Sequence, residues 1–301
     1  MPKTIDNETA VLYGLHKKFL LEPLQLRILI HHFGSAQAVL DRRDELTDFA
    51  PGSHRRISAA LDALNPDECL RELLRMQSDG IQVITHTDGC WPLAGKDDTL
   101  HLPLMLFVRS TDDTATVLDP SRRFISVVGT RDPSVHGIDT TASIVSQITA
   151  EPRTFISGLA IGIDTKVHRT ALDNGIPTIA VLPCGLDTVY PICNRRTADR
   201  IAAAPGSALI SQFPNGTAPH PVNFLTRNHV TAFLGKETIL VESKSKGGAL
   251  VTARLAGCYG NTVYAVPGRP GDIRSEGCNQ LIRELNASLF TGLPERTPDN
   301  R

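Results

Sequence analysis

Basic residues recur beside glycine and hydroxyl residues at several places in the second half of the chain. Glycine lets backbone N–H groups approach an anion closely, and the N-terminus of a following helix adds partial positive charge. Phe224, beside Arg227, could stack on a base. This pattern is typical of a surface that holds phosphate groups. The residues assigned to it are Gly129, Thr130, Arg131, Ser157, Gly158, Arg195, Phe224, Arg227, Asn228, Lys244, Lys246, Gly247, Gly248 and Arg269.

These residues lie after six apolar runs, which we interpret as buried β-strands. The runs are Ile125 to Val128, Phe155-Ile156, Thr178 to Leu182, Ala208 to Ile210, Thr238 to Val241 and Val263 to Val266. Each run precedes a loop and a helix-like segment, which indicates βαβ units. Ligands of open parallel sheets sit beyond the carboxyl ends of the strands, so these cations, Arg196 included, should converge on one rim. The alternative, that the glycines only close tight turns and the cations are solvated, is weaker because several strand ends carry cations.

The N-terminal part is expected to be helical. Apolar residues have helical spacing from Leu12 to Leu40, with a turn at Phe33 to Ser35, and again from His54 to Met76. Short β-like runs follow at Ile81 to Ile84 and Leu104 to Val108. The predicted fold class is α/β, Rossmann-like and doubly wound, with a mostly parallel sheet and a small N-terminal helical module. We expect a helical module of the SAM or helix-hairpin type over 1–78, a connector over 79–122 that packs on the next domain, a Rossmann-like domain over 123–292 and a tail over 293–301.

The composition excludes several classes of protein. The apolar fraction of 41% and charged fraction of 21% are ordinary for globular proteins, and no apolar stretch approaches the ~20 residues that span a bilayer. No secretory leader is visible, and the six cysteines form no C-x-x-C pair. We therefore expect a cytoplasmic protein with no membrane segment and no metal site. The net charge of −1 argues against a DNA coater that is basic all over, so nucleic acid would bind at a local patch.

The candidates for catalysis are weaker than those for binding. Asp164 and His168 are four residues apart at an expected helix start, where an N-cap with a packed histidine is favoured over an acid/base pair. Glu242 ends a buried strand and could order Ser243 or lysine amides. No nucleophile, zinc, P-loop or dinucleotide motif stands in a convincing context. We expect no enzymatic activity and no cofactor.

The ordered motifs resemble those of the DNA-processing protein A family, also called DprA or Smf. The match spans roughly residues 124 to 282, and 33–36 in the helical module is similar to that family's N-terminal region. Several motifs in a fixed order make the resemblance specific. They are Val127 to Arg131, Ser157 to Ala160, Gly162 to Asp164 with His168, Ile179 to Leu182, Gly185 to Asp187, Tyr190-Pro191 with Asn194, Phe224 with Arg227-Asn228, Val241-Glu242, Gly248 to Arg254, Ala265 to Gly268 and Gly277 to Ile282.

The resemblance implies a Rossmann-like domain that binds single-stranded DNA, protects it and hands it to the recombinase RecA during natural transformation. It also implies a homodimer and no catalysis. Carried over to this sequence, Arg131, Arg227 with Asn228, and Lys246 would contact phosphates, with Phe224 near the strand.

The chain departs from the family pattern at several positions. Ile161 stands where the family has a basic residue, and Gly247 to Leu250 replaces Ser-Gly-Ser-Leu. The family's Phe-Pro-x-Arg-Asn-Arg motif becomes Phe224-Leu225-Thr226-Arg227-Asn228-His229. Weaker DNA affinity, or a pH dependence through His229, is the expected consequence. Because the sheet domain is followed by only a short tail, we expect no winged-helix module of the kind that some members carry.

Other functions stay open at this point. The first is a nucleotide-binding enzyme or sensor on a related Rossmann-like fold, although its Pro-Gly-Gly-x-Gly-Thr loop with a following glutamate is missing here. The second is a divergent member with a role in mobile elements or defence against phage. A pure scaffold would leave the cations at the strand ends without an explanation.

Overall fold

The computed structural model describes residues 4–20, 22–46, 54–93, 101–147 and 151–293. Its N-terminal part is helical, as expected from the apolar spacing. The predicted turn at Phe33 to Ser35 is confirmed, because Gly34 has a φ of 94° and the Ser35 hydroxyl caps the next helix at Ala38. The elements are α1 (Asn7–Lys18), α2 (Pro23–Phe33), α3 (Ala36–Asp41), the 3-10 helix η1 (Arg43–Glu45), α5 (His54–Asp62) and α6 (Pro66–Ser78).

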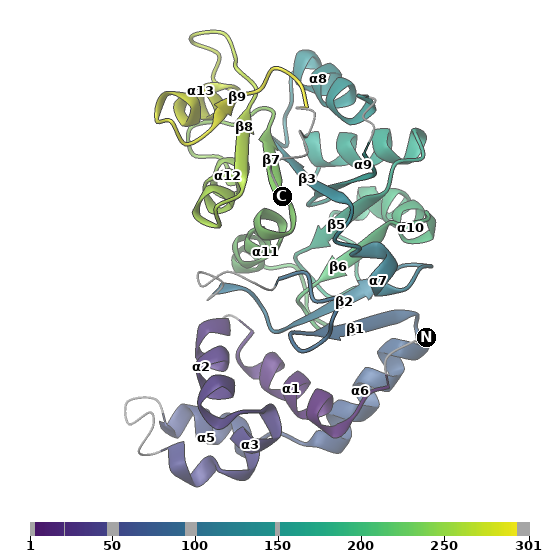
Figure 1. The fold of residues 1–301 in the computed structure, drawn as a ribbon, viewed down its shortest axis with the longest axis vertical. Helices are drawn as coiled ribbons and strands as arrows, with labels where there is room; N and C mark the ends of the chain where they lie inside the picture. Colours follow the sequence, from purple (N-terminus) through teal and green to yellow (C-terminus); the bar gives the residue numbers. More distant parts are fainter. Residues whose placement is uncertain (1–3, 21, 47–53, 94–100, 148–150, 294–301) are drawn as a thin grey trace.

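The rest of the chain forms one nine-stranded sheet with helices on both faces (Figure 1), which confirms the predicted fold class. All six strands expected from the apolar runs are present. The strand order is β1-β2-β6-β5-β4-β3-β7-β8-β9. The strands are β1 (Ile81–Thr85), β2 (Met105–Arg109), β3 (Arg123–Val128), β4 (Arg153–Ser157), β5 (Thr178–Leu182), β6 (Ala208–Ser211), β7 (Glu237–Leu240), β8 (Thr262–Ala265) and β9 (Ser288–Leu289).

The segment expected to be a connector contributes two strands to this sheet. β1 pairs antiparallel with β2, and β2 pairs antiparallel with β6, placing Val108 opposite Ile210. The pairs from β6 to β9 are parallel. Of the tail expected over 293–301, only Leu293 belongs to the described residues.

Helices cover the sheet on both sides because neighbouring strand residues point in opposite directions. Val127 packs with Ile163 of α9 on one face, whereas Val128 packs with Val230 of α11 on the other. Figure 1 shows α8, α9 and α10 on the first side and α11 and α12 on the second. The helices of this part are α7 (Thr114–Val117), α8 (Val135–Ser146), α9 (Ile163–Asp173), the 3-10 helix η3 (Ile192–Asn194), α10 (Arg195–Ala203), α11 (Pro221–Leu234), α12 (Gly248–Cys258) and α13 (Glu276–Arg283).

The N-terminal helices share a core with the antiparallel end of the sheet. Tyr13 of α1 meets Phe107 of β2 edge-on, at 6.0 Å between ring centroids. The buried His16 forms a 2.6 Å hydrogen bond with the carbonyl of Gln212, and burial lowers the pKa of its imidazole to about 4. Arg27 of α2 donates to the carbonyls of Leu102 and Pro103. The helices are therefore held to the sheet by apolar packing and by polar contacts.

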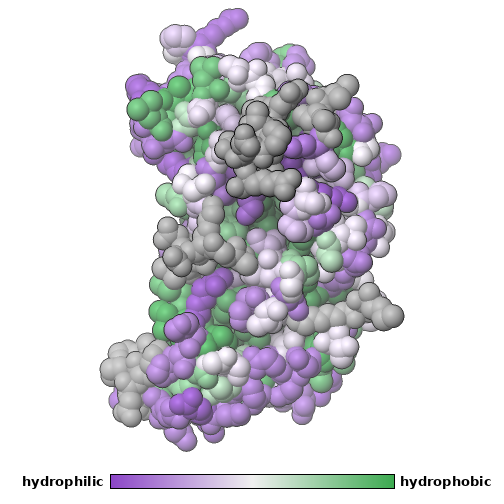
Figure 2. Space-filling view, viewed as in Figure 1, coloured by the Kyte–Doolittle hydropathy of each residue, from purple (hydrophilic) through white to green (hydrophobic). Residues whose placement is uncertain are grey.

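The outer surface is mixed. Hydrophilic residues cover most of the lower end of the view in Figure 2, over the N-terminal helices, and hydrophobic residues reach the surface over α13 and β9. Among the described helices, none is long and apolar enough to cross a bilayer.

The order in which successive strands are added to the sheet reverses at β3. The strands β4, β5 and β6 extend from one side of β3, and β7, β8 and β9 extend from the other. After β3 the chain enters α8 on one face, and after β7 it enters α12 on the opposite face. The loops after two neighbouring strands thus part, which opens a crevice at the carboxyl ends of the strands.

Candidate nucleic-acid interface

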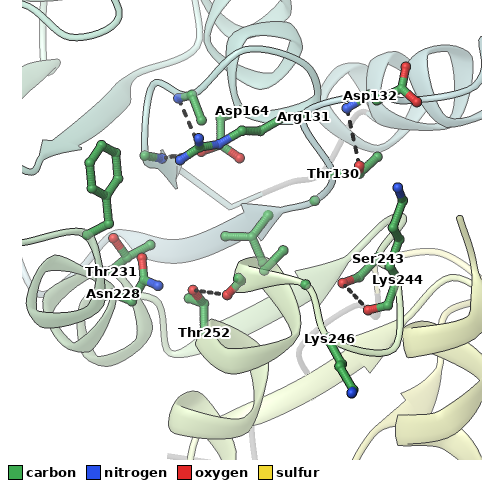
Figure 3. Close-up of a pocket in the computed structure, with 18 of the residues that line it drawn as sticks. Thr130, Arg131, Asp132, Asp164, Asn228, Thr231, Ser243, Lys244, Lys246 and Thr252 are labelled. Atoms are coloured by element: carbon green, nitrogen blue, oxygen red, sulfur yellow. Dashed lines mark hydrogen bonds between the residues drawn. The ribbon is translucent and has the colours of Figure 1, made fainter. Parts of the chain in front are cut away.

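The crevice is a pocket of about 590 Å³. Its walls come from the loops after β3, β4 and β7, from one side of α11 and from the first turn of α12 (Figure 3). The lining residues are Val128, Gly129, Thr130, Arg131, Asp132, Gly158, Ala160, Asp164, Phe224, Leu225, Arg227, Asn228, Thr231, Ser243, Lys244, Ser245, Lys246, Gly247, Gly248, Ala249, Thr252, Ile273 and Glu276.

Three exposed cations, Arg131, Lys244 and Lys246, form what we call the rim of the pocket. Lys244 and Lys246 leave the loop after β7 in opposite directions (Figure 3). The guanidinium of Arg131 lies over the ring of Phe224, 5.3 Å from its centroid, and Tyr190 meets that ring edge-on at 5.6 Å. A flat aromatic surface therefore lies directly beside a cation, the arrangement in which a base stacks while its phosphate is neutralised.

The first turn of α12 supplies backbone donors to the same pocket. Its N-cap, Gly247, has no side chain that could cap the helix, and the first amides of a helix have no intrahelical partner. Space is open above Gly248, where an added Cβ would meet nothing within 4 Å. Together with the partial positive charge of the helix N-terminus, these amides favour an anion at this point.

Arg227 and Asp164 are buried residues that line the pocket, and we call this pair the floor. The Nη1 of Arg227 donates to the carbonyls of Gly158 at 2.8 Å and Val181 at 2.5 Å, and no described residue accepts a hydrogen bond from its Nε. Burial lowers the pKa of this guanidinium. A Cβ at position 158 would overlap the guanidinium, so a larger residue there would force the Arg227 side chain to move. Arg227 thus supports the loop after β4, and a phosphate contact by it stays a prediction.

The expectation that Asp164 is an N-cap is wrong. α9 begins at Ile163 with Gly162 as its N-cap, and one carboxylate oxygen of Asp164 accepts from the amides of Gly158 and Ala160 at 3.1 and 3.3 Å. Asp164 therefore closes the loop after β4. Burial raises its pKa, opposed by the nearby charge of Arg227.

His168 is a packed residue, as the favoured interpretation has it. Its Nδ1 lies 2.8 Å from the hydroxyl of Thr178 on β5, and burial lowers its pKa to about 3. The imidazole is therefore neutral near pH 7, and it does not line the pocket. Asp164 and His168 serve two different parts of the framework.

Glu242 has a different partner from those expected. Its two oxygens accept from the Ser134 hydroxyl at 2.5 Å and the Ser134 amide at 2.9 Å, instead of ordering Ser243 or lysine amides. Thr130 donates its amide to the Glu242 carbonyl at 2.7 Å, and Ile163 donates its amide to the Thr130 carbonyl at 3.2 Å. The loops after β3, β4 and β7 are thus linked, which gives Arg131 a rigid base.

The structure brings most of the predicted site residues into this pocket. Three lie elsewhere. Ser157 is buried, with its hydroxyl donating to the Val127 carbonyl at 2.8 Å. Arg195 is exposed at the start of α10, and Arg269 is exposed on the loop after β8. The expected convergence of every strand-end cation on one rim is therefore wrong for these two arginines and for Arg196, which lines a separate notch between α9 and α10.

Some residues that line the pocket were not among the site residues predicted from the sequence. Thr231 is one helical turn beyond Arg227 on α11, and Thr252 is one turn beyond Gly248 on α12, so helical spacing could have identified both. Ile273 and Glu276 come from the segment after β8, and no sequence signal marks them. Asp132 is also in the wall, but its carboxylate is paired with Arg274 at 3.0 Å.

The residues that depart from the family pattern have different surroundings in the structure. Ile161 is exposed beside the pocket, and the Thr226 hydroxyl donates to the Val222 carbonyl within α11. His229 does not line the pocket, and its Nδ1 lies 2.6 Å from the Tyr259 hydroxyl. Burial lowers its pKa, and the nearby His101 lowers it further. Because His229 does not line the pocket, the structure gives no support to a pH dependence of binding through it, which stays a prediction.

Comparisons with known proteins agree with this architecture. The model of the family "DNA recombination-mediator protein A" matches residues 82–297. Protein Smf of Synechocystis sp. is 30% identical over 264 residues, which are 86% of this chain and 65% of that protein. This chain thus spans about two thirds of the length of that relative.

Two solved structures share the fold. DNA processing protein A of Streptococcus pneumoniae has a TM-score of 0.79 and 27% identity, with 96% of each chain covered. A structure that describes the single-stranded DNA binding mode of DNA processing protein A from Helicobacter pylori has a TM-score of 0.60 and 24% identity, covering 70% of this chain and 91% of the other. Since the family model matches well over half of its residues, the chain belongs to the DNA recombination-mediator protein A family.

Proposed function

We propose that the pocket holds the sugar-phosphate backbone of single-stranded DNA. The observation that supports this most is the convergence of three exposed cations and the uncapped start of α12 on one cavity, beside the ring of Phe224. Cations and free amides suit phosphates, and an aromatic face suits an unpaired base of any sequence. The Helicobacter pylori relative is described by its single-stranded DNA binding, which supports the same ligand for this chain.

In the cell, the proposed role is to protect single-stranded DNA and to load it with RecA during natural transformation, as a cytoplasmic homodimer and without catalysis. The pocket offers donors for binding, whereas Asp164 and His168 are engaged in holding the backbone and β5. Family membership supports a role in DNA processing.

The ligand is tested by titrating the purified protein with labelled oligo-dT, duplex DNA and small nucleotides at two salt concentrations. We expect oligo-dT to bind most tightly and its affinity to fall steeply with salt, because each neutralised phosphate contributes about −0.7 to the log–log slope. Equal binding of duplex and single strand, or binding that is insensitive to salt, would contradict the proposal.

A mononucleotide is the second candidate ligand, because a pocket of about 590 Å³ falls in the size range of small-molecule sites. The same titration separates the two. If a nucleotide binds more tightly than oligo-dT and competes with it, the pocket is a nucleotide site.

The proposed handover to RecA has its own test. RecA nucleation on oligo-dT that is already coated with single-strand binding protein is measured with and without this protein, together with protection of the strand from a nuclease. We expect faster nucleation and slower digestion, and the Arg131→Ala variant should reduce both. Unchanged nucleation would limit the role to binding.

A further inference from the structure

The notch between α9 and α10 is a second place where basic side chains gather. It has a volume of about 340 Å³ and is lined by Arg169, Arg196, Thr197 and Arg200. Figure 1 shows the two helices next to each other on the same side of the sheet. We propose that the notch binds a phosphate of the DNA strand that leaves the pocket. This inference rests on the proposed function, since the pocket must first hold the strand.

The guanidinium groups of the notch are only partly neutralised by the protein. Arg200 is paired with Asp173 at 2.7 Å, and Arg169 donates its Nε to the buried Thr197 hydroxyl at 3.3 Å. Among the described residues, no acidic partner contacts Arg169 or Arg196 within ion-pair distance. Together α9 and α10 have five cations and three carboxylates, Asp164, Asp173 and Asp199, so the two helices are net positive by two charges in a chain whose net charge is −1.

The first turn of α10 also favours a bound anion. Arg195 and Arg196 occupy the first turn of the helix, where the partial positive charge of the helix disfavours cations. No acidic residue is present in this turn, and the N-cap Asn194 does not cap the helix with its side chain. A phosphate at this end would relieve the repulsion between these cations and the helix. The Arg195 amide already donates to the Ile192 carbonyl, so arginine side chains would supply the contacts.

The notch is connected to the pocket by a short, rigid path. The side chain of Asn194 donates to the Leu159 carbonyl at 2.8 Å and to the Thr165 hydroxyl at 2.7 Å. Leu159 lies between Gly158 and Ala160, which line the pocket, so the start of α10 is attached to the pocket wall. Arg169 is five residues beyond Asp164 on α9, which is ~7.5 Å along the helix axis. A strand that exceeds the pocket therefore reaches the notch within a few nucleotides.

The proposal is tested by comparing oligo-dT strands of about 6 and about 20 nucleotides, which fill one site or extend well past it. The variant combines Arg169→Gln with Arg196→Gln. We expect its affinity for the long strand to fall about tenfold and its salt slope to become shallower by about 0.7, because one phosphate contact is lost. Binding of the short strand should equal that of the wild type.

The control is Arg71→Gln with Arg75→Gln, which removes two exposed arginines from α6 and should change neither strand. The proposal for the notch is contradicted if the Arg169→Gln, Arg196→Gln variant binds both strands like the wild type, or if it loses the same affinity for both strands. Failure of the proposed function would give a different result. In that case, Arg131→Ala would leave the affinity for the short strand unchanged. Unfolding curves of all variants should coincide with that of the wild type, because the substituted side chains are exposed.

Discussion

Arg131 on the rim and Arg227 in the floor are the same residue type on either side of one pocket, and their surroundings differ. Arg131 is exposed and rests on the ring of Phe224, whereas Arg227 is 5% exposed and donates to two backbone carbonyls. The charge of Arg131 also contributes to the lowered pKa of Arg227. A cation with free donors can recognise a phosphate, while a buried cation whose Nη1 is held by two backbone carbonyls maintains the shape of the site. Burial therefore separates binding from support.

The largest effect expected from this comparison is on the free energy of unfolding. Replacing Arg227 with methionine should lower the free energy of unfolding by about 3–5 kcal/mol, because Asp164 would be left buried without its opposite charge and two carbonyls would lose a donor. Urea denaturation measures this. The matched substitution Arg131→Met should change stability by less than about 0.5 kcal/mol, since its side chain is exposed. Equal losses in the two variants would contradict the division into rim and floor.

Acidification should lower the stability of the fold without weakening DNA binding, because buried histidines titrate and the rim cations do not. The pKa of His16 is lowered to about 4 in the folded protein, from about 6.5 when unfolded, so its contribution to stability is present above pH 6.5 and is lost as the pH falls toward 4. The loss from His16 amounts to about 2 kcal/mol at pH 5 and about 3 kcal/mol at pH 4. His168, with a pKa of about 3, acts in the same direction.

Denaturation curves between pH 7 and pH 5 measure this loss, and His16→Gln should flatten the pH dependence. Affinity for oligo-dT over the same range should stay constant, because arginine and lysine keep their charge. A fall in affinity that matches the loss of stability would mean that the pocket, too, depends on a titrating histidine.

At the rim, Arg131→Ala and Lys246→Ala should each lower the affinity for oligo-dT about tenfold and reduce the salt slope by about 0.7. Fluorescence anisotropy at several salt concentrations measures both quantities. Arg269→Ala is the matched control, because Arg269 is exposed after β8 but lies outside the pocket. If all three variants lose affinity alike, general surface charge accounts for binding and the pocket does not.

Much of the fold and the position of the pocket could be predicted from the sequence, because local patterns determine them. Runs such as Thr178 to Leu182 mark strands buried on both faces, and the residues after parallel strands must meet at one edge. The depth of each side chain could not be predicted. Arg227 is buried because it meets Gly158, 69 residues away, and Glu242 finds Ser134 across 108 residues. Arg195 and Arg196 likewise follow a strand of the sheet but lie on α10, outside the pocket.

The smallest expected effect concerns Phe224, which lies beside the rim cation Arg131. Phe224 contacts both Arg131 and Tyr190, and Phe224→Leu removes the flat face while keeping an apolar side chain of similar bulk. We expect the affinity for oligo-dT to fall about fivefold, the lower end of what one stacked base contributes. The salt slope should not change, because no phosphate contact is lost, and this separates the ring from Arg131. An abasic oligonucleotide should bind the wild type and the variant equally; a persistent difference would mean that Phe224 acts only by positioning Arg131.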